Sequence, residues 1–249
     1  MRYLFSLVLA LFITVNYATT WSESEVDDPI LDGEKCNVGE PMSYGSYIYQ
    51  WPAKYDQVFW PETVPSGIWF CEKSGFISLI GDFKRLTDSE KLNISEYLKS
   101  NNSKLKGITE KLKHLEKIYS LRHSDENFNN RLLRILAYQY ESLGEFKLAN
   151  EYRRKALHQI EARLILRKEA LTYGRLESLF LAVVYNKQLG DENKYSIFLN
   201  QLHENIRNID IKNEEIRDYA KYLEPIIEEV KMIEVGGKLA PKLEHDTDD

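Results

Sequence analysis

The side chains best suited to acid–base or metal chemistry in this sequence are five histidines and two cysteines. The histidines are scattered through the helical part of the chain and its tail, at positions 114, 123, 158, 203 and 245, and none falls in a His-Glu-x-x-His pattern. The sequence also has no Gly-x-Ser-x-Gly elbow and no phosphate-binding glycine loop. We therefore predict a protein that is not an enzyme and needs no cofactor. A hydrolase without a recognisable motif is the minor alternative.

The chemistry of Cys36 and Cys71 depends on the compartment. In an oxidising compartment two cysteines of one chain pair. The bridge closes a loop of about 36 residues and stabilises the fold by roughly 4 kcal/mol on the chain-entropy estimate. We predict a disulfide between Cys36 and Cys71 and no metal site. Two free buried thiols are the alternative.

The first twenty residues indicate export. Arg2 is followed by an apolar run from Tyr3 to Val15 and then by the small residues Ala18, Thr19 and Thr20. This order is typical of a secretory signal peptide. The run has about 13 residues, fewer than the roughly 20 that span a bilayer as a helix. We expect residues 1–20 to be a signal peptide and the protein to be periplasmic or secreted. The alternatives are a retained membrane anchor or a buried core helix.

The charge of the chain argues against nucleic acid as a partner. The formal net charge is -6 over 249 residues, whereas nucleic-acid binding requires a basic surface. Residues 21–35 are acidic and poor in apolar side chains, which predicts a solvated linker. Residues 237–249 are also polar and acidic, and we expect a disordered tail there.

Residues 36–83 are rich in aromatic side chains and predict a small β-rich module. Short apolar and aromatic runs separated by prolines favour strands near 47–51, 57–60, 67–71 and 76–80. Exposed aromatic side chains would offer a surface for a glycan or another small molecule. The residues considered for that role are Tyr47, Tyr49, Trp51, Trp60 and Trp69. The alternative is that these large side chains form the core of the module.

Residues 84–236 show helical periodicity. Thr87 and Glu90 form a capping box, which predicts a helix from Asp88 to about Lys99. Apolar spacing and turn residues predict six more helices, over about 104–121, 124–144, 145–171, 175–189, 193–206 and from 213 onward. Pro225 is expected to kink or end the last of them.

Within this region, the two helical segments of Arg131–Leu157 meet at Leu143 and Gly144. The segment resembles a tetratricopeptide repeat in its small, aromatic and turn positions, which are Ala137, Tyr140, Gly144, Ala149 and Ala156. Residues 182–202 are similar but degenerate. The resemblance implies an antiparallel array of helical hairpins that binds a protein segment. An accidental helical hairpin is the alternative.

The resemblance also implies which residues face a ligand: Arg131, Arg134, Tyr138 and Glu141, which we call the α-stripe. They share one face of a helix with 3.6 residues per turn. Two arginines on such a face can bind a carboxylate bidentately. Two alternatives are open: the face is merely solvated, or the arginines pair with internal acids such as Glu141 or Glu169.

A weaker resemblance concerns the β-rich module. The segments Ile68–Phe76 and Cys36–Gly39 look like two halves of a zinc ribbon, each keeping one cysteine. They are similar to an uncharacterised bacterial family that joins such a ribbon to a tetratricopeptide-like tail. Gly39 and Ser74 stand where the second ligands belong, and structural zinc needs four. The resemblance implies an exported version in which a disulfide replaces the zinc.

Together these patterns predict a mainly α fold, with a tetratricopeptide-like array of antiparallel helical hairpins behind a small disulfide-stapled β-rich module. We expect an exported, non-enzymatic interaction or scaffold protein of the bacterial envelope. Its expected partner is a protein or peptide segment, including one that carries a carboxylate. A membrane is a partner only if residues 1–20 stay as an anchor. The alternative function is glycan or small-molecule binding by the aromatic segment.

Overall fold

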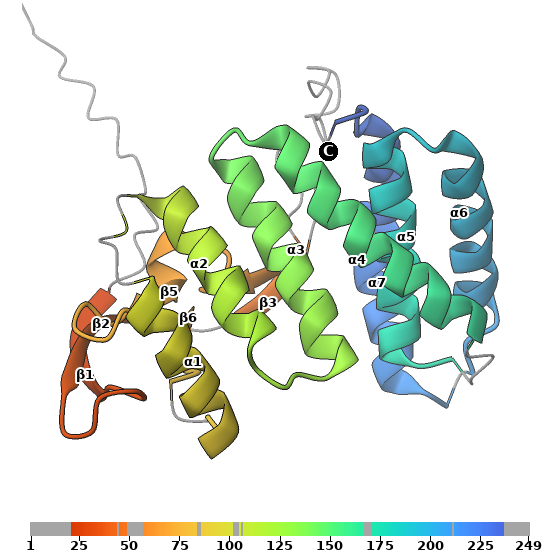
Figure 1. Cartoon of the computed structure of the whole chain (residues 1–249). Helices are drawn as coiled ribbons and strands as arrows, with labels where there is room; N and C mark the ends of the chain where they lie inside the picture. The colour runs from red at the N-terminus through yellow and green to blue at the C-terminus, as the bar shows by residue number, and fades with distance from the viewer. Residues whose placement is uncertain are drawn as a thin grey trace, which may run out of the picture.

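The computed structural model describes residues 21–43, 45–48, 57–83, 86–101, 105, 107–166, 171–210 and 212–236. In this part of the chain a β-rich module precedes seven α-helices, which confirms the predicted mainly α fold (Figure 1). The expected signal peptide and C-terminal tail lie outside the described residues. Among the described helices, none has both the length and the apolar character needed to cross a membrane.

The β-rich module consists of three antiparallel hairpins in the described residues. Their strands are β1 (Trp21–Asp27) with β2 (Lys35–Pro41), β3 (Gly45–Ile48) with β4 (Gln57–Trp60), and β5 (Ile68–Phe70) with β6 (Ile77–Leu79). The strands expected near 57–60, 67–71 and 76–80 are present. The strand expected near 47–51 is present as β3, although residues 49–56 lie outside the described part of the chain.

The prediction of a solvated linker over residues 21–35 is wrong. Strand β1 lies in this segment and pairs with β2 along its whole length. The acidic side chains of Glu23, Glu25 and Asp27 are exposed, whereas Trp21 and Val26 pack against the core. The segment is therefore a strand with two core-facing apolar residues, although its composition is mostly polar and acidic. A turn closes the hairpin, with the Asp28 amide donating to the Glu34 carbonyl at 3.0 Å.

The helices follow the predicted order. They are α1 (Asp88–Ser100), α2 (Ile108–Ser120), α3 (Glu126–Ser142), α4 (Phe146–Leu166), α5 (Tyr173–Leu189), α6 (Glu192–Arg207) and α7 (Glu214–Glu229). Thr87 and Glu90 form the expected capping box at the start of α1. Gly144 and Gly190 end α3 and α5 with φ angles of 79° and 81°, the left-handed region that glycine enters at no steric cost.

Three helices differ from the prediction. Helix α2 begins at Ile108, not near residue 104. Helix α5 begins at Tyr173, where an interruption was expected, because the Thr172 side chain caps it by accepting from the Arg175 amide. Helix α7 runs through Pro225. A proline inside a helix costs about 3 kcal/mol. The buried residues Leu223, Ile226 and Ile227 offset this cost, since each stabilises the fold by roughly 1.5–3 kcal/mol.

Helix packing forms antiparallel hairpins. Helix α3 packs against α4, α4 against α5, α5 against α6, and α7 against α5 (Figure 1). Ala137, Ala149 and Ala156 are fully buried, as expected for positions where helices approach closely. The rings of Tyr140 and Tyr152 stack at 5.3 Å between α3 and α4. The array thus matches the predicted hairpin architecture.

The β-rich module and the first helices share one hydrophobic core. Phe76 and Phe83 of the module belong to the same buried cluster as Ile94 of α1 and Leu115 of α2. A second cluster joins the end of α4 to α5, α6 and α7, and Leu133 packs against both clusters. The predicted boundary between residues 83 and 84 therefore does not separate two cores.

Candidate functional site

The α-stripe on α3 is not an open helix face. Arg134 is 8 % exposed and Glu141 is 6 % exposed, so the expectation of a ligand-facing surface is wrong for both. Glu141 accepts from Arg153 of α4, which is fully buried, in an ion pair inside the hairpin. The alternative of internal pairing concerned Arg131 and Arg134, whereas this ion pair joins Glu141 to Arg153 of the next helix. Arg131 and Tyr138 are half-buried.

The α3 face is covered by the protein's own β-rich module. The Gln139 side-chain amide donates to the Glu62 carbonyl at 3.0 Å, and β4 packs against α3. An Arg131 guanidinium nitrogen lies 3.5 Å from a Glu62 carboxylate oxygen. Burial raises the pKa of Glu62, and the Arg131 charge opposes that shift. The carboxylate that Arg131 meets in the structure therefore belongs to the same chain.

The first helix of the second hairpin is covered as well. Helix α5 packs against α4, α6 and α7, and α7 lies behind it in Figure 1. Ten of its residues are buried, among them Phe180, Val184 and Tyr185. A helix that is apolar on all sides belongs to a core. Neither α3 nor α5 therefore offers an open groove in the described structure.

A cavity of about 490 Å³ lies between the β-rich module and the turn from α2 to α3. Its wall carries a bidentate ion pair, with Arg122 donating to Asp82 at 2.7 and 3.0 Å. The Tyr119 hydroxyl donates to the same carboxylate at 2.8 Å and accepts from the Leu79 amide. Burial raises the pKa of Tyr119, so its hydroxyl stays protonated. These groups mainly satisfy one another, which favours a structural role for the cavity wall.

A second hollow, of about 780 Å³, lies on the other side of the array, between α4, the start of α5 and α6. We call it the outer groove. Its lining residues are Glu161, Leu164, Ile165, Leu171, Arg175, Lys194, Ile197, Phe198, Gln201, Glu204, Asn205 and Asn208. It contains none of the residues predicted from the sequence to bind a partner.

Exposed apolar side chains gather at the outer groove. Ile165 is 73 % exposed and Ile197 is 47 % exposed, and Leu166, beside Ile165 at the end of α4, is 81 % exposed. Clustered exposed apolar side chains mark interaction sites, whereas single ones are ordinary. At one end of the groove the Lys194 ammonium pairs with Glu161 at 2.8 Å.

Amide side chains line the α6 wall of the outer groove. Gln201, Asn205 and Asn208 follow one another at spacings of four and three residues, so they lie on one face of the helix. Each side-chain amide both donates and accepts hydrogen bonds. This spacing is visible in the sequence, but nothing there distinguishes it from an ordinary solvated face, because the groove exists only once α4 lies beside α6.

The aromatic alternative is not supported at Trp69. This side chain is 6 % exposed, donates to the Gly39 carbonyl at 2.8 Å and packs edge-on against Phe83 at 5.4 Å. It is a core residue of the module. Tyr49 and Trp51 lie outside the described residues, and the structure describes Tyr47 and Trp60 as strand positions only, without their side chains.

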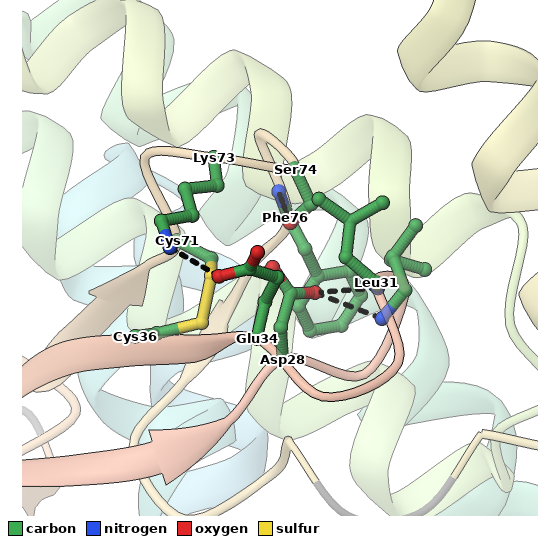
Figure 2. The surroundings of a disulfide bond; sticks show 9 residues. Asp28, Leu31, Glu34, Cys36, Cys71, Lys73, Ser74 and Phe76 are labelled. Carbon is green, nitrogen blue, oxygen red and sulfur yellow. Dashed lines mark hydrogen bonds and ion pairs between the residues drawn. A yellow bond between two sulfur atoms is a disulfide. The ribbon is translucent and has the colours of Figure 1, made fainter.

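The predicted disulfide between Cys36 and Cys71 is present, with Cα atoms 5.0 Å apart. It ties β2 to the residue that follows β5. The Asp28 carboxylate lies beside it, and Lys73 pairs with Glu34 at its edge (Figure 2). Among the described residues, Asp28, Cys36 and Cys71 form the one group of His, Cys, Asp or Glu side chains close enough to share a metal ion.

The disulfide is consistent with an oxidising compartment, where such bonds form and persist. Comparison of the chain with protein-family models, curated proteins and solved structures finds no match.

Proposed function

We propose that this protein is an exported, non-enzymatic interaction protein that binds an extended peptide segment of a partner protein in its outer groove. The proposal rests on one observation: exposed apolar side chains and the amide side chains of Gln201, Asn205 and Asn208 line the same hollow between helices. The faces of α3 and α5 are occupied by the chain itself, whereas the outer groove is an open hollow of about 780 Å³ on the array.

The chemistry of the groove favours an extended peptide over a helix. A bound helix satisfies its own backbone and requires only an apolar surface, whereas an extended segment exposes backbone donors and acceptors. Gln201, Asn205 and Asn208 offer matching amides on α6. Ile165 and Ile197 offer apolar contacts for alternate side chains of the segment. We expect the bound segment to carry apolar residues at every second position.

Export rests on the N-terminal sequence and on the disulfide. The run Tyr3–Val15 resembles the apolar core of a signal peptide, and the Cys36–Cys71 bond is stable where thiols are oxidised. Within this proposal the partner is a protein of the same compartment, and the resemblance to a bacterial family makes the bacterial envelope the compartment we propose.

The proposal is tested by selecting peptides from a random displayed library on the full chain and measuring their affinity. Ile197→Arg places a charge in the apolar part of the groove, and we expect it to weaken binding at least about tenfold, or 1.4 kcal/mol. Ile197 is partly exposed, so this change should alter stability by less than about 0.5 kcal/mol.

Asn200→Ala is the matched control, because Asn200 is exposed on α6 outside the groove. It should leave affinity and melting temperature unchanged. If no peptide is selected, or if Ile197→Arg and Asn200→Ala bind the selected peptides equally well, the outer groove is not the binding surface. Co-purification from the native envelope fraction would then be the way to look for another surface.

A further inference from the structure

The strongest unexplained feature lies at the disulfide. Asp28 is 5 % exposed, and one of its carboxylate oxygens, Oδ1, accepts from the amides of Ile30 and Leu31 at 2.9 and 3.1 Å. The other oxygen, Oδ2, lies 2.8 Å from Cys71 Sγ. A sulfur atom in a disulfide carries no hydrogen to donate. The oxidised protein therefore holds a buried carboxylate oxygen against a sulfur that cannot donate to it (Figure 2).

A buried polar atom without a donor is costly and calls for an explanation. Reduction removes the conflict, because a thiol can donate to Asp28 Oδ2. Reduction also creates a cluster of metal-ligand type: the sulfur atoms of Cys36 and Cys71 and a carboxylate oxygen of Asp28 all lie within 4.8 Å of one another. All three residues are buried.

We propose that, when the disulfide is reduced, Cys36, Cys71 and Asp28 form a binding site for a thiolate-preferring divalent cation such as Zn²⁺. Thiolate sulfur and carboxylate oxygen are both ordinary zinc ligands. Three protein ligands leave one position of a tetrahedral ion for solvent. This site is independent of the outer groove, which lies on α4, α5 and α6.

The geometry allows the change with small movements. Around a tetrahedral ion with Zn–S bonds of about 2.3 Å, two sulfur atoms lie about 3.8 Å apart. The Cα atoms of Cys36 and Cys71 are 5.0 Å apart, so rotation of the two side chains can provide that separation. The hydrogen bonds to Asp28 Oδ1 hold the carboxylate in place, as ligand-orienting contacts do in metal sites.

Reduction of the disulfide takes up two electrons and two protons. A phosphine reductant attacks the S–S bond, takes oxygen from one water molecule to become the phosphine oxide, and leaves the two hydrogens on the two sulfur atoms. In a cell a dithiol would supply the same two electrons and two protons and become a disulfide. The cation then displaces both thiol protons to solvent, since it binds thiolates. Disulfide and cation are thus alternative links between the same two cysteines.

The test uses the full chain, produced and purified under a phosphine reductant, with both thiols verified by titration. Co²⁺ serves as the probe, because cobalt bound to thiolate shows an intense charge-transfer absorption. We expect one Co²⁺ per reduced chain, displaced by Zn²⁺, and no such absorption from the oxidised chain. Reduced protein without this absorption would overturn the proposal.

Asp28→Asn separates a built site from two thiols that bind metal by themselves. The asparagine keeps the oxygen that caps Ile30 and Leu31, but it removes the anionic ligand. We expect it to weaken Co²⁺ binding at least about tenfold. Asp27→Asn is the control, because Asp27 is exposed beside it and pairs with Lys35. If Asp28→Asn and Asp27→Asn bind Co²⁺ with equal affinity, the proposal is contradicted. The same holds if reduction unfolds the module, because two thiols of an unfolded chain would bind Co²⁺ equally well in both variants.

Discussion

At the scale of single residues, the largest difference from the sequence prediction is the position of the Glu141 side chain. It was expected to face a ligand, but it lies 6 % exposed against the fully buried Arg153. Sequence spacing places Glu141 on the same stripe as Arg131, yet spacing alone does not say which neighbour covers that stripe. The partner of Glu141, Arg153, lies 12 positions away on α4, and Glu62, which contacts Gln139 of the same helix, lies 77 positions from Gln139.

The buried pair gives a prediction about stability. Arg153→Ala removes the buried ion-pair partner of Glu141, and breaking a buried ion pair typically costs 3–5 kcal/mol. We expect the free energy of unfolding, measured by denaturant titration, to decrease by that amount. Replacing both partners, as Glu141→Leu with Arg153→Met, should restore most of it, because the charges leave together. Arg154→Ala is the exposed control and should change little. An equal loss in Arg154→Ala and Arg153→Ala would contradict this account.

His114 predicts how stability depends on pH. Its ring nitrogens face the Tyr97 hydroxyl at 3.1 Å and the Gly75 carbonyl at 2.9 Å. Burial lowers the pKa of His114, and the Gly75 carbonyl opposes that shift. In the unfolded chain the pKa of His114 is about 6.5, higher than in the folded protein. As the pH falls through this value, the unfolded chain takes up a proton that the folded protein does not, so the free energy of unfolding decreases.

The measurement is the free energy of unfolding between pH 7.5 and 5, at pH steps of about half a unit, a window set by that pKa of about 6.5. His114→Gln keeps a hydrogen-bonding side chain but cannot titrate. We expect its stability to fall less steeply than that of the unchanged chain in this window. Identical slopes for the two proteins would show that His114 does not carry the pH dependence.

At the scale of elements, much of the fold could be predicted from local patterns. The capping box at Thr87 and the turn glycines Gly144 and Gly190 mark helix ends, because they act within a few residues. Strand β1 was missed because its two apolar residues, Trp21 and Val26, are separated by serines and glutamates, so the segment lacks the apolar alternation that marks a half-buried strand. Pro225 was expected to kink or end α7, because the free-energy cost of proline inside a helix can be read from the sequence. The burial of α7 against α5, which offsets that cost, cannot.

Helix α7 offers a direct test of that compensation. Pro225 is exposed, so Pro225→Ala should remove the backbone cost without loss of core. We expect a gain of about 2 kcal/mol, which is the helix cost of proline less the entropy that alanine returns to the unfolded chain. Calorimetric melting measures it, with Glu224→Ala as the exposed neighbour control. A lower melting temperature for Pro225→Ala would mean that proline stabilises the protein at this position.

At the scale of the whole molecule, the shared core determines how the protein unfolds. All four tryptophans, at positions 21, 51, 60 and 69, lie in the β-rich module or its first strand, whereas helical circular dichroism reports mainly on α1–α7. One buried cluster joins the module to α1, α2 and α3, and Leu133 also packs against the second cluster of α4–α7, so we expect both signals to change in one transition.

Removing the disulfide should move that transition without splitting it. Cys36→Ser with Cys71→Ser should cost up to roughly 4 kcal/mol on the chain-entropy estimate. Fluorescence and circular dichroism of the variant should still have the same midpoint. Two separate midpoints, with the module unfolding first, would show that residues 36–83 are an independent unit after all.

The candidate site could not be predicted from sequence, because it forms only when α4 and α6 lie side by side. The measurement that tests the account most directly compares two variants with the same selected peptide. Ile197→Arg should weaken binding at least about tenfold and leave the melting temperature unchanged. Arg131→Ala with Arg134→Ala should lower the melting temperature, since Arg131 pairs with Glu62 of the β-rich module and Arg134 is buried, and should leave affinity unchanged. The reverse result, with affinity lost in the arginine variant and kept in Ile197→Arg, would contradict the outer groove as the binding surface.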